Sequence, residues 1–398
     1  MERIIVENLK TEVRYSCDVL VCGGGFAGIA AAVAAARCGS KVILLEKQFM
    51  LGGLGTAGLV TMYLPICDGE GHQASYGLAE GLLRLSVKYG GEGRYPKEWL
   101  EIGTEEERKK YRFELRYNAQ MFAILAERFL LENGVKILYG TSVCAAEVKD
   151  GKISAVSCDN KSGRFAVEAK SFVDCTGDAD LCRYAGADTA VFEQKNVLAA
   201  WYYFLSGGNF DLKMLGFADK PDKYKTPEER SVGTKRYEGL DGEELSDMMC
   251  DSHAKILEDI LTRREKGEKD IVPTTIATIP QIRMTRRIVG EYTQNDTEIR
   301  VHYDDSVGVF SDWRKRGPVY ELPFRTLYGK KIKNLICAGR CISVTDAMWD
   351  ITRVIPVCAV TGEAAGTAAA LSDDFASLDV SVLREKLRAA GVKTDIDF

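Results

Sequence analysis

The feature that most constrains the fold of this chain is a glycine-rich run near its start, Gly23-Gly24-Gly25-Phe26-Ala27-Gly28. The mostly apolar residues 18–22 predict a strand before it, and the alanine-rich residues 29–37 predict a helix after it. In such a unit the first glycine makes a tight turn, the second lets backbone N–H groups approach a pyrophosphate, and the third allows close packing. The next predicted strand, 41–45, ends at Glu46, whose carboxylate can accept ribose hydroxyls. This order predicts a dinucleotide-binding unit.

A buried or membrane-spanning helix is the alternative for this region, because residues 19–36 are almost free of charge. The three consecutive glycines argue against it, since each would cost a helix about 1 kcal/mol relative to alanine. Arg37 and Gly39 are typical of a helix end. Residues 1–15 are charged and mixed, without the apolar core of a secretory signal. We therefore expect a cytoplasmic protein without membrane insertion.

Composition limits the partners of the chain. A length of 398 residues suits two domains, and a formal net charge of -5 offers no basic surface for nucleic acid. The 12 cysteines are scattered rather than spaced as a disulfide framework. No CxxC pair occurs and the three histidines lie far apart, so we expect no zinc or iron–sulfur site. A small-molecule substrate is the expected partner, and a homo-oligomer is allowed by these data.

The remaining pattern indicates a domain built from distant parts of the chain. A helix over 118–132 and a strand over 135–139 precede three alternating segments, 142–148, 152–158 and 164–169, which predict an antiparallel meander. Further strands are predicted at 171–175 and 334–338, and Pro356 favours the first turn of a closing helix that runs through Ala370. We predict a cofactor domain over 1–60, 115–190 and 326–398, and a substrate or cap domain over 61–114 and 191–325.

These pieces in this order resemble the FAD-dependent oxidoreductases of the glutathione-reductase-like fold, distantly related to fumarate reductase flavoproteins. The resemblance rests on five stretches: 18–47, 51–60, 173–181, 281–292 and 320–371. It implies an α/β fold with a Rossmann-like FAD-binding domain, in which a central parallel sheet carries a three-stranded antiparallel meander. That domain is assembled discontinuously, with an inserted α+β substrate domain. No histidine lies near Gly53, where some relatives attach flavin covalently, so the resemblance implies non-covalent FAD.

The same resemblance assigns cofactor contacts. It implies that the pyrophosphate is held by Gly23, Gly25, Phe26, Ala27 and Gly28, and the adenosine ribose by Glu46 and Lys47. The remaining contacts it implies are Gly53 and Thr56 beside the flavin, Val143 at the adenine, and Thr176, Gly177, Asp178, Gly339 and Arg340 along the cofactor. Arg353, Val354 and Ile355 precede the closing helix. The start of that helix would stabilise negative charge on the reduced flavin.

Catalytic residues are less constrained. Read as one strand, 281–292 places Arg283, Thr285 and Arg287 on one face and Arg286 on the other. These arginines either meet the substrate or tie the two domains together through ion pairs. Asp312 is either a general base or the cap of a turn. Relatives carry a glutamate where Met284 stands and a histidine near Asp312, and neither is present here.

The leading functional hypothesis is transfer of a hydride equivalent between flavin N5 and a small polar substrate, either a sugar-like alcohol or a hydroxy acid. One alternative is a C=C reductase of the fumarate-reductase type, with Arg286 or Arg353 as the proton donor. The other is a flavin-bearing electron carrier or non-catalytic subunit. The sequence leaves the electron acceptor or donor unknown.

Overall fold

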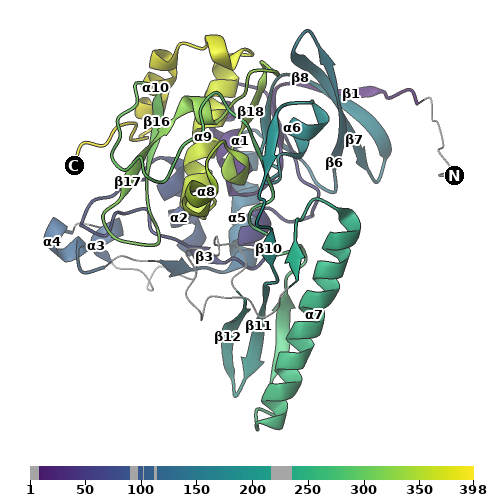
Figure 1. The fold of residues 1–398 in the computed structure, drawn as a ribbon, viewed down its shortest axis with the longest axis vertical. Coiled ribbons are helices and arrows are strands. Elements are labelled where there is room, and N and C mark those ends of the chain that lie inside the picture. Colours follow the sequence, from purple (N-terminus) through teal and green to yellow (C-terminus); the bar gives the residue numbers. More distant parts are fainter. Residues whose placement is uncertain (1–8, 90–96, 102, 112–113, 217–234) are drawn as a thin grey trace.

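The computed structural model describes residues 9–89, 97–101, 103–111, 114–216 and 235–398. The larger part of the molecule, in the upper half of Figure 1, contains a seven-stranded sheet. The strand order is β5-β2-β1-β8-β7-β6, with β18 also beside β8. The bounds are β1 Val13–Cys22, β2 Val42–Leu45, β5 Lys136–Leu138, β6 Ser142–Lys149, β7 Lys152–Asn160, β8 Gly163–Asp174 and β18 Leu335–Cys337.

Strand β8 joins the two halves of this sheet. Its first residues pair antiparallel with β7, which pairs antiparallel with β6. Its last residues, Phe172–Asp174, pair parallel with β18, and β1, β2 and β5 continue the parallel part. This confirms the predicted fold class. The prediction of two strands, 164–169 and 171–175, is wrong, because β8 runs through both without a break.

Two apolar helices pack against each other beside the parallel strands. They are α1, Phe26–Arg37, and α9, Ile355–Leu371, and both are buried over most of their length. A Cβ atom added at Gly362 would lie 2.2 Å from the carbonyl oxygen of Ala27, and one at Gly366 would lie 2.1 Å from that of Ala31. Glycine at these two positions of α9 is therefore what lets the two backbones approach so closely. Helices α2, Leu78–Val87, α5, Ala119–Glu132, and α10, Val380–Ala389, pack around the pair.

A second part of the molecule extends away from this sheet, as Figure 1 shows. Strands β11, Ala200–Ser206, β12, Asn209–Leu215, and β14, Val272–Ile276, form a sheet, and α7, Gly242–Glu265, packs on it. Smaller pairs join β3 Met62–Tyr63 to β4 Leu115–Arg116, β9 Thr189–Val191 to β15 Arg286–Ile288, β10 Asn196–Val197 to β13 Arg236–Tyr237, and β16 Ser306–Ser311 to β17 Val319–Pro323. The shorter helices are α3 Lys97–Leu100, α4 Glu105–Arg108, α6 Asp180–Tyr184 and α8 Asp346–Thr352. The exact domain bounds stay a prediction, and 90–96 and 217–234 of the predicted cap lie outside the described residues.

The prediction of one strand over 281–292 is wrong over most of its length. Only Arg286–Ile288 form a strand, β15, which pairs with β9. Thr285 and Arg286 both donate side-chain hydrogen bonds to the 178–180 segment, to Asp178 and to Asp180 respectively. Tertiary contacts thus replace the alternation that an isolated strand would show.

Among the described residues, no single helix is long and apolar enough to cross a membrane. One pair, α8 and α9, passes that test together, but the two helices are bent by 92° at the break between them.

Candidate cofactor and substrate site

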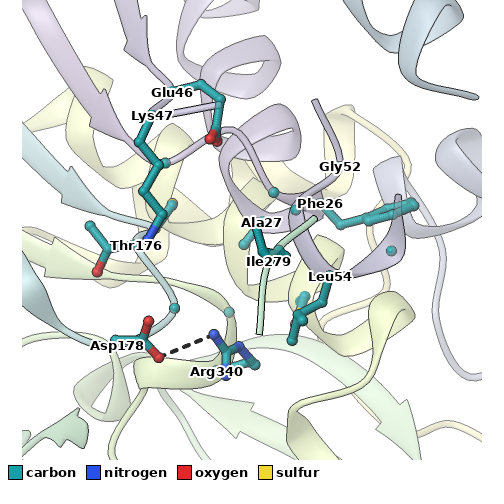
Figure 2. A pocket seen from close by; sticks show the side chains of 18 of the residues that line it. Phe26, Ala27, Glu46, Lys47, Gly52, Leu54, Thr176, Asp178, Ile279 and Arg340 are labelled. Carbon is teal, nitrogen blue, oxygen red and sulfur yellow. Dashed lines mark hydrogen bonds and ion pairs between the residues drawn. The ribbon is translucent and has the colours of Figure 1, made fainter. Parts of the chain in front are cut away.

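A single cavity of about 590 Å³ brings together the cofactor segments predicted from the sequence. Within the described part of the chain, every predicted cofactor residue lines it except Gly28 and Thr56. Figure 2 shows Glu46 and Lys47 at the top, Asp178 and Arg340 at the bottom, and Thr176 between them near the end of the Lys47 side chain. The predicted cofactor residues that line the cavity are Gly23, Gly25, Phe26, Ala27, Glu46, Lys47, Gly53, Val143, Thr176, Gly177, Asp178, Gly339, Arg340, Val354 and Ile355.

The three motif glycines have different structural roles. Gly23 has φ +108°, and a Cβ atom there would lie 2.3 Å from the carbonyl oxygen of Cys175. A Cβ atom at Gly28 would lie 1.8 Å from the carbonyl oxygen of Gly23, so Gly28 packs against the turn behind the pocket. A Cβ atom at Gly25 would meet no described atom within 4 Å. Gly25 therefore faces open pocket, in the place where a pyrophosphate would approach the backbone.

Helix α1 begins at this turn and directs its N-terminus toward the cavity. Its first intrahelical hydrogen bond runs from the N–H of Ile29 to the carbonyl oxygen of Gly25 at 2.9 Å. The N–H groups of Phe26, Ala27 and Gly28 precede that bond, and Phe26 and Ala27 line the cavity. The partial positive charge at the start of the helix suits an anion there.

The carboxylate of Glu46 supports the glycine turn directly. One oxygen accepts the N–H of Gly24 at 2.7 Å and the other accepts the N–H of Gln48 at 2.7 Å. Burial raises the pKa of Glu46, and these backbone N–H groups oppose the rise. Each oxygen keeps a further lone pair, which a ribose hydroxyl could use. Lys47 is exposed, and in Figure 2 its side chain points toward the side of the pocket where Thr176 lies.

Thr56 closes its own turn instead of facing the cavity. Its hydroxyl donates to the carbonyl oxygen of Leu51 at 2.5 Å, and its side chain packs where a Cβ atom at Gly52 would lie. At this turn Gly53 lines the cavity, and a Cβ atom added to it would lie 3.4 Å from the Cα atom of Gly25. The flavin contact predicted for Thr56 stays a prediction, and the structure shows instead that its hydroxyl shapes this turn.

The opposite wall is fixed by three carboxylates. Asp174 is fully buried and accepts the N–H and hydroxyl of Thr176 and the N–H of Cys182, at 2.7 to 3.0 Å. Asp178 accepts the hydroxyl of Thr285 at 2.7 Å. Asp180 lies 2.6 Å from Arg286, and burial together with the other two carboxylates raises its pKa to about 6.

Arg340 connects this wall to the second part of the molecule. One guanidinium nitrogen lies 3.2 Å from the carboxylate of Asp178 (Figure 2). The other donates to the carbonyl oxygens of Ile282 and Arg283 at 3.1 and 2.6 Å. A Cβ atom at Gly177, where φ is +84°, would lie 2.5 Å from the same guanidinium. The Thr176-Gly177-Asp178 motif and Arg340 therefore fit together only with glycine between them.

The start of α9 completes the cavity. Val354 precedes the helix in an extended conformation and Pro356 occupies its first turn, as predicted. At this end of the helix the N–H of Cys358 donates to the carbonyl oxygen of Val354 at 2.9 Å. The N–H groups of the first turn, next to Val354 and Ile355 in the cavity wall, therefore face the place predicted for the flavin.

The four predicted catalytic residues separate into two groups. Arg283 and Arg353 line the cavity. Arg283 is 4% exposed, with its guanidinium 5.2 Å from the centre of the Trp201 ring, and Arg353 lies 2.8 Å from Asp350. Arg286 and Asp312 are not among the described residues that line it.

Arg286 and Asp312 both make structural ion pairs. Arg286 bonds to Asp180 and to the carbonyl oxygen of Asp178, which matches the alternative in which it ties the two domains together. Asp312 is fully buried and both of its oxygens accept from the guanidinium of Arg314 at 2.9 Å. Catalytic roles for these two residues stay predictions, without support from their positions.

Sequence reasoning missed the side of the cavity formed by the second part of the molecule. Apolar side chains line it at Val60, Met62, Leu64, Leu245, Ile279 and Ile282. The alternation of apolar residues over 60–64 was an available signal in the sequence. The contributions of α7 and of 279–282 depend on tertiary folding.

Comparison with known proteins identifies the family. The model of a family described as FAD dependent oxidoreductase matches residues 18–199 and 208–389. A thioredoxin reductase from Ureaplasma parvum serovar 3 is 41% identical over 70 residues, which cover 18% of this chain and 23% of that protein. A putative bifunctional amine oxidase from Dictyostelium discoideum is 40% identical over 79 residues, which cover 19% of this chain and 7% of that protein. The matches therefore span less than a quarter of these curated relatives.

A solved structure of a geranylgeranyl bacteriochlorophyll reductase-like protein from Thermoplasma acidophilum is also similar. It has a TM-score of 0.45 and 14% sequence identity, and the match covers 95% of this chain and 82% of that chain.

Proposed function

Because this chain belongs to the family of FAD-dependent oxidoreductases, with FAD as its cofactor, we propose that it transfers a hydride equivalent to or from a small polar substrate. The observation that supports this proposal is the single cavity that joins the cofactor segments to Arg283. When bound, FAD supplies a two-electron acceptor or donor at N5. The substrates that we propose are a hydroxy acid and, as second choice, a sugar-like alcohol.

The chain's own groups would bind and orient the cofactor. The open backbone at Gly25 and the first N–H groups of α1 suit the pyrophosphate, because a Cβ atom at Gly25 would fill the space that it needs. Glu46 and Lys47 suit the adenosine ribose, and Val143 lines the cavity where adenine is expected. The start of α9 suits the flavin edge on which negative charge develops.

Arg283 favours a hydroxy acid over a sugar-like alcohol. A guanidinium binds a carboxylate through two parallel hydrogen bonds, and such pairs are stronger than those between neutral groups. Burial at 4% exposure strengthens the interaction further because water screens it less. Oxidation of the acid would transfer a hydride from carbon 2 to N5 of FAD and release the hydroxyl proton to solvent, which leaves a 2-oxo acid, and reduction is the reverse.

C=C reduction remains a second candidate, which the position of Arg353 favours. Arg353 lines the cavity immediately before α9, and Asp350 is bound to it at 2.8 Å. A charged side chain in that place could deliver a proton to a carbon atom while a hydride arrives at the neighbouring carbon. This candidate requires a substrate with an activated double bond.

Anaerobic mixing of the purified protein tests these proposals. The oxidised protein is mixed with hydroxy acids and with sugar alcohols, and the reduced protein with enoates, while the flavin absorbance is followed. We expect bleaching by a hydroxy acid, with a higher KM and unchanged flavin content in Arg283→Gln. Arg128→Gln, on an exposed part of α5, is the control. Protein that holds FAD but reacts with none of these compounds would instead fit an electron carrier.

A further inference from the structure

One side of the cavity is not explained by the cofactor. Its residues come from 60–64, from the first turn of α7 and from 278–283. None of these segments contains a residue predicted to contact the cofactor. We call six of them the apolar wall: Val60, Met62, Leu64, Leu245, Ile279 and Ile282. Thr278 and Arg283 are the polar residues of the 278–283 segment that also line the cavity.

The first segment of the apolar wall is set by an extended backbone. Val60, Met62 and Leu64 are half-buried and line the cavity, whereas Thr61 and Tyr63 between them are fully buried. The hydroxyl of Thr61 is bonded to that of Tyr203, and the hydroxyl of Tyr63 donates to the carbonyl oxygen of Ala79 at 2.5 Å. Because side chains alternate along an extended chain, these bonds hold the three apolar side chains on the cavity side.

The other segments of the wall are held equally firmly. Gln281 donates to the carbonyl oxygen of Gly58 at 2.6 Å and accepts the N–H of Trp201 at 2.7 Å. Arg340 donates to the carbonyl oxygen of Ile282, whose side chain packs with Leu245 in one cluster. Bonds within the protein therefore hold the segments that carry the apolar wall, and Arg283 follows Ile282 directly in the chain.

We infer that the substrate is a 2-hydroxy acid whose remaining part is apolar, either branched aliphatic or aromatic. This inference rests on the proposed function and names the substrate class of the same site. The carboxylate would lie at Arg283 and the apolar part against the apolar wall, where it loses contact with water. A polar part would lose its water there without gaining hydrogen bonds from these six side chains, so the site discriminates against it.

A panel of hydroxy acids with one shared head group tests the inference. Glycolate and lactate have almost no side chain, malate has a charged one, and 2-hydroxyisocaproate and phenyllactate have apolar ones. We expect kcat/KM for anaerobic flavin reduction to be at least about tenfold higher for the last two than for lactate, and lowest for malate. A kcat/KM for malate or glycolate equal to or higher than that for 2-hydroxyisocaproate and phenyllactate would overturn the inference while leaving the proposed function intact.

Two shape-conserving substitutions show whether the wall causes the preference. Val60→Thr and Met62→Gln replace apolar groups with polar ones of similar size at half-buried positions. We expect the preference for phenyllactate over lactate to fall about tenfold in the double variant. Val382→Thr, at a position 40% exposed on α10, should keep the wild-type ratio. A double variant that changes FAD affinity but keeps the ratio would show that the wall covers only the flavin, and would overturn the inference.

The hydroxy-acid panel separates failure of the proposed function from failure of the inferred substrate class. If no hydroxy acid of the panel bleaches the flavin, the proposed function is contradicted and the inference falls with it. If some of them bleach it, the proposed function stands, and the order of the rates alone decides the inference.

Discussion

The guanidinium of Arg340 lies 3.2 Å from the carboxylate of Asp178, and the same guanidinium donates to the carbonyl oxygens of Ile282 and Arg283. Asp178 follows the last strand of the meander, and Arg340 follows the last strand of the parallel sheet. The 282–283 segment belongs to the part of the chain that forms the apolar wall. One side chain thus fixes the position of the substrate-facing segment relative to the cofactor segments.

Replacement of Arg340 should loosen both regions at once. Arg340→Gln removes a charge-assisted hydrogen bond to Asp178 and leaves two carbonyl oxygens without their donor, so we expect the free energy of unfolding to fall by about 2 kcal/mol. FAD affinity should fall as well. Thermal melting with and without FAD measures both effects. Arg128→Gln is the exposed control, and melting and FAD binding like the wild type in Arg340→Gln would contradict the role described.

The contact between α1 and α9 predicts a second effect on stability. Gly366→Ala would place a methyl group 2.1 Å from the carbonyl oxygen of Ala31, so the helices must separate. We expect a loss of about 1–3 kcal/mol from this overpacking, although alanine favours the helix by about 1 kcal/mol. Gly242→Ala, in α7, meets no described atom within 4 Å and should melt at or above the wild-type temperature. Equal melting of Gly366→Ala and wild type would refute the close contact.

Glu363 predicts a pH dependence of stability. Its carboxyl group accepts the N–H of Leu78 at 2.6 Å, and burial raises its pKa from 4.5 to about 7. The folded protein therefore holds this proton more tightly than the unfolded chain. The resulting stability is fully present below about pH 4.5 and is lost as the pH rises to about 7.

Glu363→Gln imitates the protonated form, so the variant should exceed the wild type in stability at pH 8 by on the order of 3 kcal/mol. The difference should shrink toward pH 4.5. Melting temperatures of both proteins between pH 5 and pH 8 measure it, with Glu132→Gln on exposed α5 as the control. A difference in melting temperature between the two proteins that does not vary with pH would contradict a raised pKa of Glu363 in the folded protein.

Local sequence patterns were sufficient for the elements that carry the cofactor segments. The turn at Gly23, the helix predicted over 118–132 and the start of α9 at Pro356 each depend on a few neighbouring residues, and all three are confirmed, with Asn118 as the cap of α5. The five stretches on which the family resemblance rests, in their order along the chain, were also enough to identify the family. The physical reason is that a turn with a required positive φ, or a helix end with a required donor, leaves few residue choices.

Some side-chain contacts of the folded chain were not predicted from the sequence. Thr56 resembles a flavin contact in its motif, but its hydroxyl closes the turn to Leu51. Thr285 and Arg286 donate hydrogen bonds to the carboxylates of Asp178 and Asp180, more than 100 residues away, and these contacts could not be predicted from strand alternation. Asp312 accepts the backbone N–H of Arg314 at 2.9 Å, which supports the alternative in which it caps a turn, and its pairing with the Arg314 guanidinium was not predicted. In each case the deciding partner is set by the folded chain.

Titration of FAD into the apoprotein, in wild type and Gly25→Ala, tests the central claim most directly. Gly25 faces open cavity, so its added methyl group should leave the melting temperature of the apoprotein unchanged and occupy the space of the pyrophosphate. The account predicts a yellow wild type that binds one FAD per chain, and a folded Gly25→Ala with affinity at least about tenfold weaker. A folded wild type that binds no FAD, or a Gly25→Ala variant that binds it equally well, would contradict the account.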